Sequence, residues 1–171
     1  MISKAEIICI GDELLLGKTI DTNSSWISLE LMKLGIKVKY KSIISDNESE
    51  IINALKRSEK SDLIIITGGL GPTKDDITKK TICKYFNTTL KTNNIILKRL
   101  KSKFKSVGKT LNDLNKKQAE LPVGANLLFN DWGTAPGMIL ERNNSIFVFF
   151  PGVPIEMRSI FKTYFLPKIK K

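Results

Sequence analysis

The sequence contains no histidine, only two cysteines among its 171 residues, and no apolar run long enough to cross a bilayer. Without histidine, neither a Ser-His-Asp nor a Cys-His catalytic centre can form, and every zinc site with imidazole ligands is excluded. Any general base must therefore be a carboxylate, a lysine, a tyrosine or a metal-bound hydroxide. Two cysteines are too few for a disulfide framework in a chain of this size, so we interpret Cys9 and Cys83 as buried thiols. The apolar run at residues 7–10 is too short for the core of a signal peptide, and we expect a cytoplasmic protein.

The chain carries a large surplus of positive charge, with 28 lysines and arginines against 17 acidic residues and a formal net charge of +11. Such a surplus can indicate a nucleic-acid partner. Here the lysines are spread along the chain, and only residues 91–109 are locally dense. We therefore expect attraction of anionic small molecules and no nucleic-acid partner. The length and the 42% hydrophobic fraction predict a single domain over residues 1–171 with no membrane partner.

Apolar runs alternate with helical patterns along the first half of the chain. Strands are predicted at residues 5–10, 36–44 and 63–66, and helices at residues 25–34, 48–60 and 77–86. This alternation predicts an α/β protein with a parallel sheet and helices on both of its faces. Farther along, the patterns predict helices at residues 93–104 and 111–119, a turn and short strand within 121–129, a β-hairpin at 138–149 and a closing helix at 154–165.

The most informative segment is the glycine-rich turn at residues 67–78, between a buried strand and a helix. Glycines let backbone N–H groups crowd around an anion, and the start of the helix adds positive potential. The adjacent carboxylates of Asp75 and Asp76 lie in the same turn. Together these features indicate a phosphorylated ligand held through a divalent cation.

Three further loops carry residues of the kind that sites need. Asp12 and Glu13 follow the first predicted strand, Asp46 follows the second, and the fourth region pairs residues 133–137 with residues 150–156. The carboxyl ends of parallel strands face one edge of a sheet. The Asp12–Glu13 loop, the Asp46 loop and the glycine-rich turn therefore share one rim if their strands are neighbours. Carboxylates from three loops could hold Mg²⁺-like ions there, with phosphate oxygens completing the shell.

Each loop also has a purely structural interpretation, which remains open. Asp21 and Asp46 could be simple helix caps, and either Asp75 or Asp76 could cap the helix that follows the turn. Residues 151–154 could form only a rigid turn, with a proline that opens the closing helix.

Four segments in this order resemble the N-terminal domain of competence/damage-inducible protein A (CinA), a member of the molybdopterin-binding (MoCF-like) superfamily. They are GDELLLG with DTNS at residues 11–24, TGGLGPTKDD at 67–76, GTAPG at 133–137 and FPGVPIEM at 150–157. The resemblance covers essentially the whole chain. It implies a three-layer α/β/α fold with a mostly parallel sheet and a small β-hairpin.

The resemblance also implies a function. CinA-type members are described as metal-dependent ADP-ribose pyrophosphatases, whereas relatives in molybdenum-cofactor synthesis bind molybdopterin with a similar glycine-rich turn. Their Asp-x-Thr is matched here by Asp76 and Thr78. Those relatives usually have threonine where this chain has Leu70, which favours the CinA branch.

Our main expectation is a divalent-metal-dependent nucleotide pyrophosphatase, a hydrolase acting on ADP-ribose or a related dinucleotide with Mg²⁺, Mn²⁺ or Co²⁺ as cofactor. The expected catalytic residues are Asp76, Asp46 and Lys74, and the expected metal ligands are Asp12, Glu13 and Asp75. The expected substrate contacts are Gly68, Gly69, Gly71, Thr78, Asn23, Ser24, Gly133, Thr134, Pro151 and Gly152.

Two other hypotheses stay open. The first is a module that binds molybdopterin or a nucleotide on the same rim without turnover, so the partner in either case is a small-molecule nucleotide or pterin. The second is a DNA-associated competence factor, suggested by the family name and the charge. Assembly into a homo-oligomer is left open as well.

Overall fold

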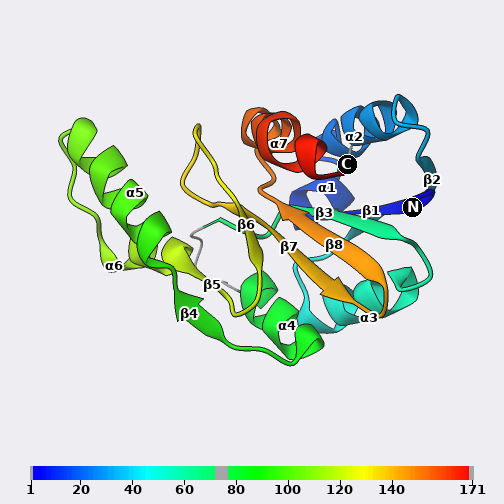
Figure 1. Ribbon diagram of the computed structural model, residues 1–171, viewed down its shortest axis with the longest axis horizontal. Helices are drawn as coiled ribbons and strands as arrows, with labels where there is room; N and C mark the ends of the chain where they lie inside the picture. Colours follow the sequence, from blue (N-terminus) through cyan, green and yellow to red (C-terminus); the bar gives the residue numbers. More distant parts are fainter. Residues whose placement is uncertain (1, 72–76, 170–171) are drawn as a thin grey trace.

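A six-stranded sheet forms the centre of the molecule in the computed structural model, which describes residues 2–71 and 77–169 (Figure 1). The order of its strands is β2-β1-β3-β8-β7-β6. Their bounds are β1 Lys4–Ile10, β2 Lys37–Ile44, β3 Leu63–Thr67, β6 Asn126–Leu128, β7 Gly137–Arg142 and β8 Ser145–Phe150. The pairs β1–β2, β1–β3 and β3–β8 are parallel, whereas β7 and β6 continue the sheet antiparallel. The predicted fold class, a mostly parallel sheet with a small hairpin, is confirmed.

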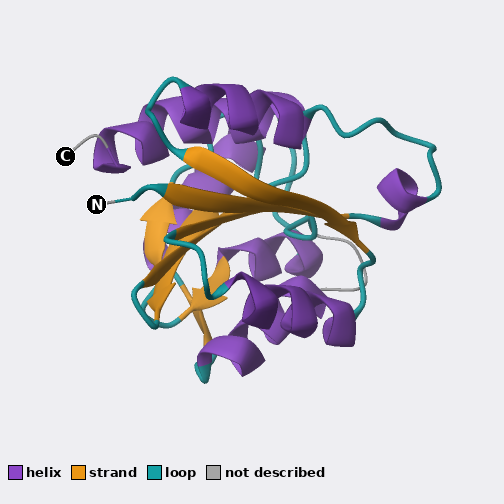
Figure 2. Ribbon diagram, turned by 90° about the vertical axis from the view of Figure 1, so that its right-hand side faces the viewer, coloured by secondary structure: helices purple, strands orange, loops and turns teal. Residues whose placement is uncertain are grey.

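Helices cover both faces of this sheet, which Figure 2 shows nearly edge-on. In β1, Ile7 and Cys9 pack towards α2 (Asn23–Met32) and α7 (Pro154–Ile160). Ile8 and Ile10 pack on the other face, among side chains of α3 (Glu48–Ser58) and α4 (Ile77–Phe86). Because successive side chains of a strand point to opposite faces, an almost continuously apolar strand supplies both cores. The result is the expected three-layer α/β/α arrangement.

Local capping explains several element boundaries. The side chain of Asn47 accepts hydrogen bonds from the backbone of Ser49 and Glu50 and begins α3. Asn143 and Asn144 form the turn between β7 and β8 with φ angles of 51° and 64°. Asparagine tolerates this left-handed conformation well, and two such residues make the turn that suits a two-residue hairpin. The hairpin predicted at residues 138–149 is confirmed, and β8 also joins the parallel part of the sheet.

A small outlying region contains α5 (Asn94–Ser106), α6 (Asp113–Lys116) and a two-stranded sheet of β4 (Leu90–Thr92) with β5 (Glu120–Pro122). It lies at the left of Figure 1. The prediction of one helix at 111–119 was wrong: α6 has a single turn and is followed by a 3₁₀ turn at Lys117–Ala119. The helix begins only after Asn112, whose side chain caps α6, and it cannot continue past residue 119 because Glu120–Pro122 pair with β4.

The end of the chain also differs from prediction. The closing helix consists of α7, a wider π turn at Phe161–Phe165 and α8 (Leu166–Ile169). Pro167 within α8 has no backbone N–H to donate to the turn before it. The π turn at Phe161–Phe165 lies directly before α8. Within the described ranges, no helix combines the length and apolarity that a membrane span needs.

Candidate functional site

Three of the predicted loops meet at the carboxyl edge of the parallel strands. They enclose a cavity of about 440 Å³ that is lined by Asp12, Glu13, Asp46 and the glycine-rich turn. The ends of β1, β2 and β3 lie side by side because β1 pairs with both neighbours. The predicted shared rim is therefore confirmed as an arrangement of loops.

Glycine is required at two positions in the wall of this cavity. Gly68 has a φ of 105°, and a Cβ there would overlap the carbonyl oxygen of Ile10. Gly69 has a φ of 68°, and a Cβ there would overlap the hydroxyl of Thr78 in the first turn of α4. The turn thus passes so close to β1 and α4 that only a residue without a side chain fits.

The N–H groups of the three glycines differ in what they offer a ligand. Gly68 donates its N–H to the carbonyl of Phe150 at 3.1 Å, so it continues the sheet. The N–H groups of Gly69 and Gly71 make no hydrogen bond within the described part of the chain. Of the three glycine N–H groups that we expected to bind phosphate, two remain as donors in this conformation.

Asn23 ties three parts of the fold together beside the cavity. Its Nδ2 donates to the carbonyl of Gly152 at 2.7 Å and to Oγ1 of Thr67 at 3.2 Å, and Thr67 Oγ1 donates to the carbonyl of Pro151 at 3.2 Å. These bonds fix the orientation of the amide, because Nδ2 must face two acceptors. The Oδ1 of Asn23 is buried and has no hydrogen-bond partner among the described residues. An acceptor left in this state costs about 1–3 kcal/mol, which a ligand with a suitable donor could recover.

Asp21 acts as a helix cap, as the structural interpretation proposed. Its carboxylate accepts hydrogen bonds from the backbone N–H of Ser24 at 2.9 Å, from the Ser24 hydroxyl, and from the thiol of Cys9 at 3.4 Å. Burial raises the pKa of Asp21, but the hydrogen bonds from Ser24 and Cys9 outweigh it and the net pKa is lowered. Burial, reinforced by the charge of Asp21, raises the pKa of the Cys9 thiol, which therefore stays protonated. Ser24, an expected substrate contact, is engaged by Asp21 and does not line the cavity.

The carboxylates at the rim do not by themselves form a metal centre. Asp12 and Glu13 are exposed on the short helix α1 (Asp12–Leu15), and Asp46 is half-buried. Because Asn47 caps α3, Asp46 is not the capping side chain. Within residues 2–71 and 77–169, no three side chains of His, Cys, Asp or Glu are grouped closely enough to hold a metal ion. The remaining expected acidic residues and the expected catalytic lysine lie outside the described residues: Asp75, Asp76 and Lys74.

The other expected substrate contacts divide between two places. Gly152 lines the cavity at the sheet edge, whereas Pro151 is buried behind it and Thr78 packs against Gly69. Gly133 and Thr134 line a second cavity of about 300 Å³, between α5 and the loop after β6.

Lys103 of α5 reaches the loop on the other side of this second cavity. Its Nζ donates to the carbonyls of Asp131 at 3.1 Å and Gly133 at 2.8 Å. The two predicted halves of the fourth loop region are nevertheless linked. Asn130 donates to the carboxylate of Glu156 at 2.7 Å and accepts from the Gly133 N–H. These hydrogen bonds hold the loop of residues 130–136 against α5 and α7.

Sequence reasoning missed two residues that line the cavity and two buried polar side chains that do not line it. Thr19 and Ile20 line the cavity although neither belongs to a residue type that signals binding, whereas Pro154, which also lines it, belongs to the predicted fourth region. Lys79 is only 2% exposed, and its Nζ donates to the carbonyl of Lys117 at 3.0 Å. Gln118 is 1% exposed, and neither of its amide atoms has a partner among the described residues. A lysine in a helical pattern is normally read as exposed, so no sequence signal could have found the burial of Lys79.

Comparison with known proteins places this architecture in a family. A family model described as "Probable molybdopterin binding domain" matches residues 6–171. The crystal structure of CinA from Thermoplasma acidophilum superimposes with a TM-score of 0.85 at 32% identity, over 94% of this chain and 95% of that one. The chain is a CinA-like member of the molybdopterin-binding domain family. The resemblance seen in the sequence is thereby confirmed.

Longer relatives share this CinA-like domain. A CinA-like protein from Cytophaga hutchinsonii is 49% identical over 97% of this chain, and a competence-damage inducible protein from Clostridium kluyveri is 46% identical over 98%. The chain spans only about two fifths of their length, 40% and 42% respectively. The tungsten cofactor synthesizing protein MoaB from Pyrococcus furiosus has a TM-score of 0.61 at 22% identity, over 99% of this chain and 96% of that one. At that identity the match supports the fold alone.

Proposed function

We propose that this CinA-like domain binds a phosphorylated small molecule of the pterin or nucleotide class in the cavity at the carboxyl edge of the sheet. The observation that carries the proposal is the pairing of two kinds of unused polar group in one cavity. Gly69 and Gly71 line the cavity with N–H donors, and Asn23 lines it with an amide whose buried Oδ1 has no partner among the described residues. The family description adds support for a pterin.

These donors and this acceptor require two different chemical groups on the ligand. Phosphate oxygens only accept hydrogen bonds, so they suit the N–H groups of Gly69 and Gly71. They cannot pair with Asn23 Oδ1, which needs an N–H or O–H donor. Such donors occur on a pterin ring, a nucleobase or a ribose. The proposed ligand therefore carries both a phosphate and a polar ring or sugar.

Hydrolysis of a phosphoanhydride, as in ADP-ribose, is the second candidate. It is favoured by Asp12, Glu13 and Asp46, which line the same cavity. Carboxylates repel a phosphate unless a cation lies between them. A divalent ion such as Mg²⁺, Mn²⁺ or Co²⁺ would supply that charge and lower the pKa of a bound water. Among the described residues these three carboxylates are the candidates to hold it or its waters.

Calorimetry with molybdopterin and with ADP-ribose tests the proposal, each in EDTA and in Mn²⁺. For the wild-type protein we expect binding in EDTA. In EDTA, the double variant Asp12→Asn with Glu13→Gln should bind more tightly, by about threefold for each charge removed at roughly 7 Å in a water-filled site. The double variant Asp113→Asn with Glu141→Gln is the matched control for charge, since both residues are exposed and neither lines the cavity.

The outcomes separate the two candidates. Release of AMP from ADP-ribose in Mn²⁺, together with weaker binding by the double variant in Mn²⁺, would favour hydrolysis. Binding without any product would favour the binding module. Absence of heat with both ligands under both conditions would refute the proposed function.

A further inference from the structure

A second surface concentrates positive charge away from the ligand cavity. A groove of about 510 Å³ lies beside the outermost strand β2 and the end of α3. We call it the basic groove; its lining residues are Lys4, Glu6, Lys39, Tyr40, Lys41, Ser42, Arg57, Lys60 and Ser61. Lys4 begins β1, whereas Ile10 at the other end of that strand lines the ligand cavity. Six residues of a strand span about 20 Å, so the two places are well separated along β1.

The fold assembles the charge of the basic groove from three distant segments. Residues 4–6, 39–42 and 57–61 meet because β1 pairs in parallel with β2 and α3 ends beside them. Among the described residues that line it, five have cationic side chains and one, Glu6, has a carboxylate. None of the five cations forms an ion pair with a residue in the described ranges. Lys41 acts electrostatically on the carboxylate of Asp21, and Lys4 on that of Asp62, but the surplus of positive charge remains and suits a partner with several negative charges.

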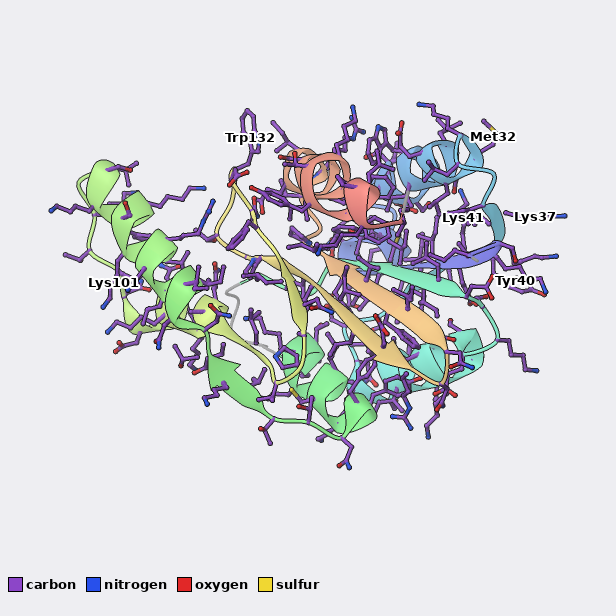
Figure 3. All side chains as sticks on the ribbon, in the orientation of Figure 1. Met32, Lys37, Tyr40, Lys41, Lys101 and Trp132 are labelled. Carbon is purple, nitrogen blue, oxygen red and sulfur yellow. The ribbon has the colours of Figure 1, made fainter. Side chains whose placement is uncertain are left out.

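An exposed aromatic ring lies among these cations. Tyr40 is 69% exposed, pairs with Glu6 of β1, and lines the groove together with Arg57 and Lys60. Figure 3 labels it at the outer edge of the sheet with Lys37 and Lys41. Within the described part of the chain, the Tyr40 ring has no aromatic partner and its hydroxyl makes no hydrogen bond. An open ring beside backbone-tracking cations is the combination on which unpaired bases stack.

The chemistry of the surface selects one occupant. A second copy of the chain could pair along the open edge of β2 only by bringing Lys37, Lys39 and Lys41 against their own counterparts, which like charge disfavours. A free phosphate would use only some of the five cations and would leave Tyr40 without a role. We propose that the basic groove binds single-stranded nucleic acid without sequence preference, with phosphates on the cations and a base on Tyr40. The sequence-based expectation of no nucleic-acid partner depended on lysines spread along the chain, and the fold gathers part of them here.

Fluorescence anisotropy with a labelled oligothymidylate of about 12 nucleotides tests this proposal on the wild-type chain. Five phosphate contacts predict a slope of log affinity against log salt of about −3.5. Binding should therefore weaken by about 100-fold between about 50 mM and about 200 mM KCl.

Variants locate the binding. Lys39→Glu, Arg57→Glu and Lys60→Glu together should weaken binding by at least about 30-fold, since three of five phosphate contacts become repulsive. The matched control is a second triple variant with the same net charge as the first, whose substitutions lie outside the groove: Lys98→Glu, Lys101→Glu and Lys109→Glu. This control should cost less than about threefold. Tyr40→Leu should cost about tenfold through lost stacking and leave the salt slope unchanged.

Circular dichroism and thermal unfolding establish that each variant is folded before it is compared. Three results would overturn the proposal: no wild-type binding at about 50 mM KCl, equal losses in the two triple variants, or competition by polyglutamate as strong as by unlabelled oligonucleotide. The last result would assign the groove to an acidic peptide. ADP-ribose calorimetry on the groove variants should match the wild-type protein, so this test is independent of the ligand cavity.

Discussion

Replacing Gly68 with alanine should destabilise the protein far more than the same replacement at Gly71, although both glycines line the ligand cavity. The two positions differ in backbone conformation and in free space. Gly68 has a φ of 105°, and an added Cβ would overlap the carbonyl oxygen of Ile10 and lie 3.1 Å from its carbonyl carbon. Gly71 lies outside the left-handed region, and no atom of the described residues comes within 4 Å of an added Cβ.

The magnitudes follow from these two facts. The backbone conformation at Gly68 costs a residue with a side chain about 1–3 kcal/mol. The overlap adds to this, because the neighbour is the backbone of a buried strand rather than a flexible side chain. We expect a total loss of about 3 kcal/mol, or a fall in Tm of about 6–12 °C for a chain of this length. Alanine at Gly71 should change the stability by less than about 0.5 kcal/mol or raise it slightly.

Urea unfolding followed by circular dichroism measures both variants under the same conditions. Gly71→Ala also keeps its N–H, so it should bind ligand as the wild type does, while Gly68→Ala should lose binding along with stability. Equal stabilities for the two variants would refute the claim that the turn is packed against β1.

Three further predictions concern titration, reactivity and capping. Because the hydrogen bonds at the start of α2 outweigh burial, the pKa of Asp21 is lower in the folded than in the unfolded state. The ionised carboxylate therefore stabilises the fold at neutral pH, and this stabilisation is lost as the pH falls through the folded-state pKa. The destabilisation caused by Asp21→Asn in urea should accordingly shrink between about pH 7 and about pH 3, and a constant difference would contradict this. Burial raises the pKa of both Cys9 and Cys83, so a thiol reagent should label them only in urea; fast labelling of the native protein would show that the thiols are accessible. Asn93 accepts hydrogen bonds from two backbone N–H groups at the start of α5, so Asn93→Ala should cost about 1 kcal/mol while the neighbouring Asn94→Ala should cost little; similar losses in thermal unfolding would argue against the cap.

The regular elements of the main sheet were predictable because their signals are local. The run at residues 63–66 is apolar, and all of Leu63–Thr67 is buried, as a central parallel strand must be. The pattern of α3 likewise predicts an apolar stripe of Ile51, Ile52 and Leu55, of which Ile51 and Leu55 are buried in the core and Ile52 is half-buried. From such elements and the rule that parallel strands align their ends, the common rim of Asp12, Glu13 and Asp46 follows without a structure.

Other features depend on contacts that the sequence does not reveal. The three residues Leu90–Thr92 form β4 only because they pair with Glu120–Pro122, and three residues are too few to show alternation. The N–H of Gly68 is consumed by Phe150, far along the chain, so its role in the site could not be separated from that of Gly69. The turn's composition indicates anion binding, while only the fold decides which of its donors remain open.

The same limit applied to the fourth loop region. The order of the segments indicated that residues 133–137 and 150–156 act together, and Asn130 does bridge them through Glu156. The cavity that Gly133 lines is formed by α5, whose position relative to the sheet has no local sequence signal. The distribution of charge depends on the fold in the same way, since lysines that are distant in sequence converge beside β2.

A ¹⁵N–¹H correlation spectrum recorded during titration with molybdopterin, and again with ADP-ribose, tests the central claim most directly. We predict that the largest shift changes occur at the backbone amides of Gly69 and Gly71 and at the side-chain amide of Asn23, and that they saturate together. Changes confined to α5 and the loop of residues 130–136, or no change with either ligand, would contradict the assignment of the ligand to the carboxyl edge of the sheet.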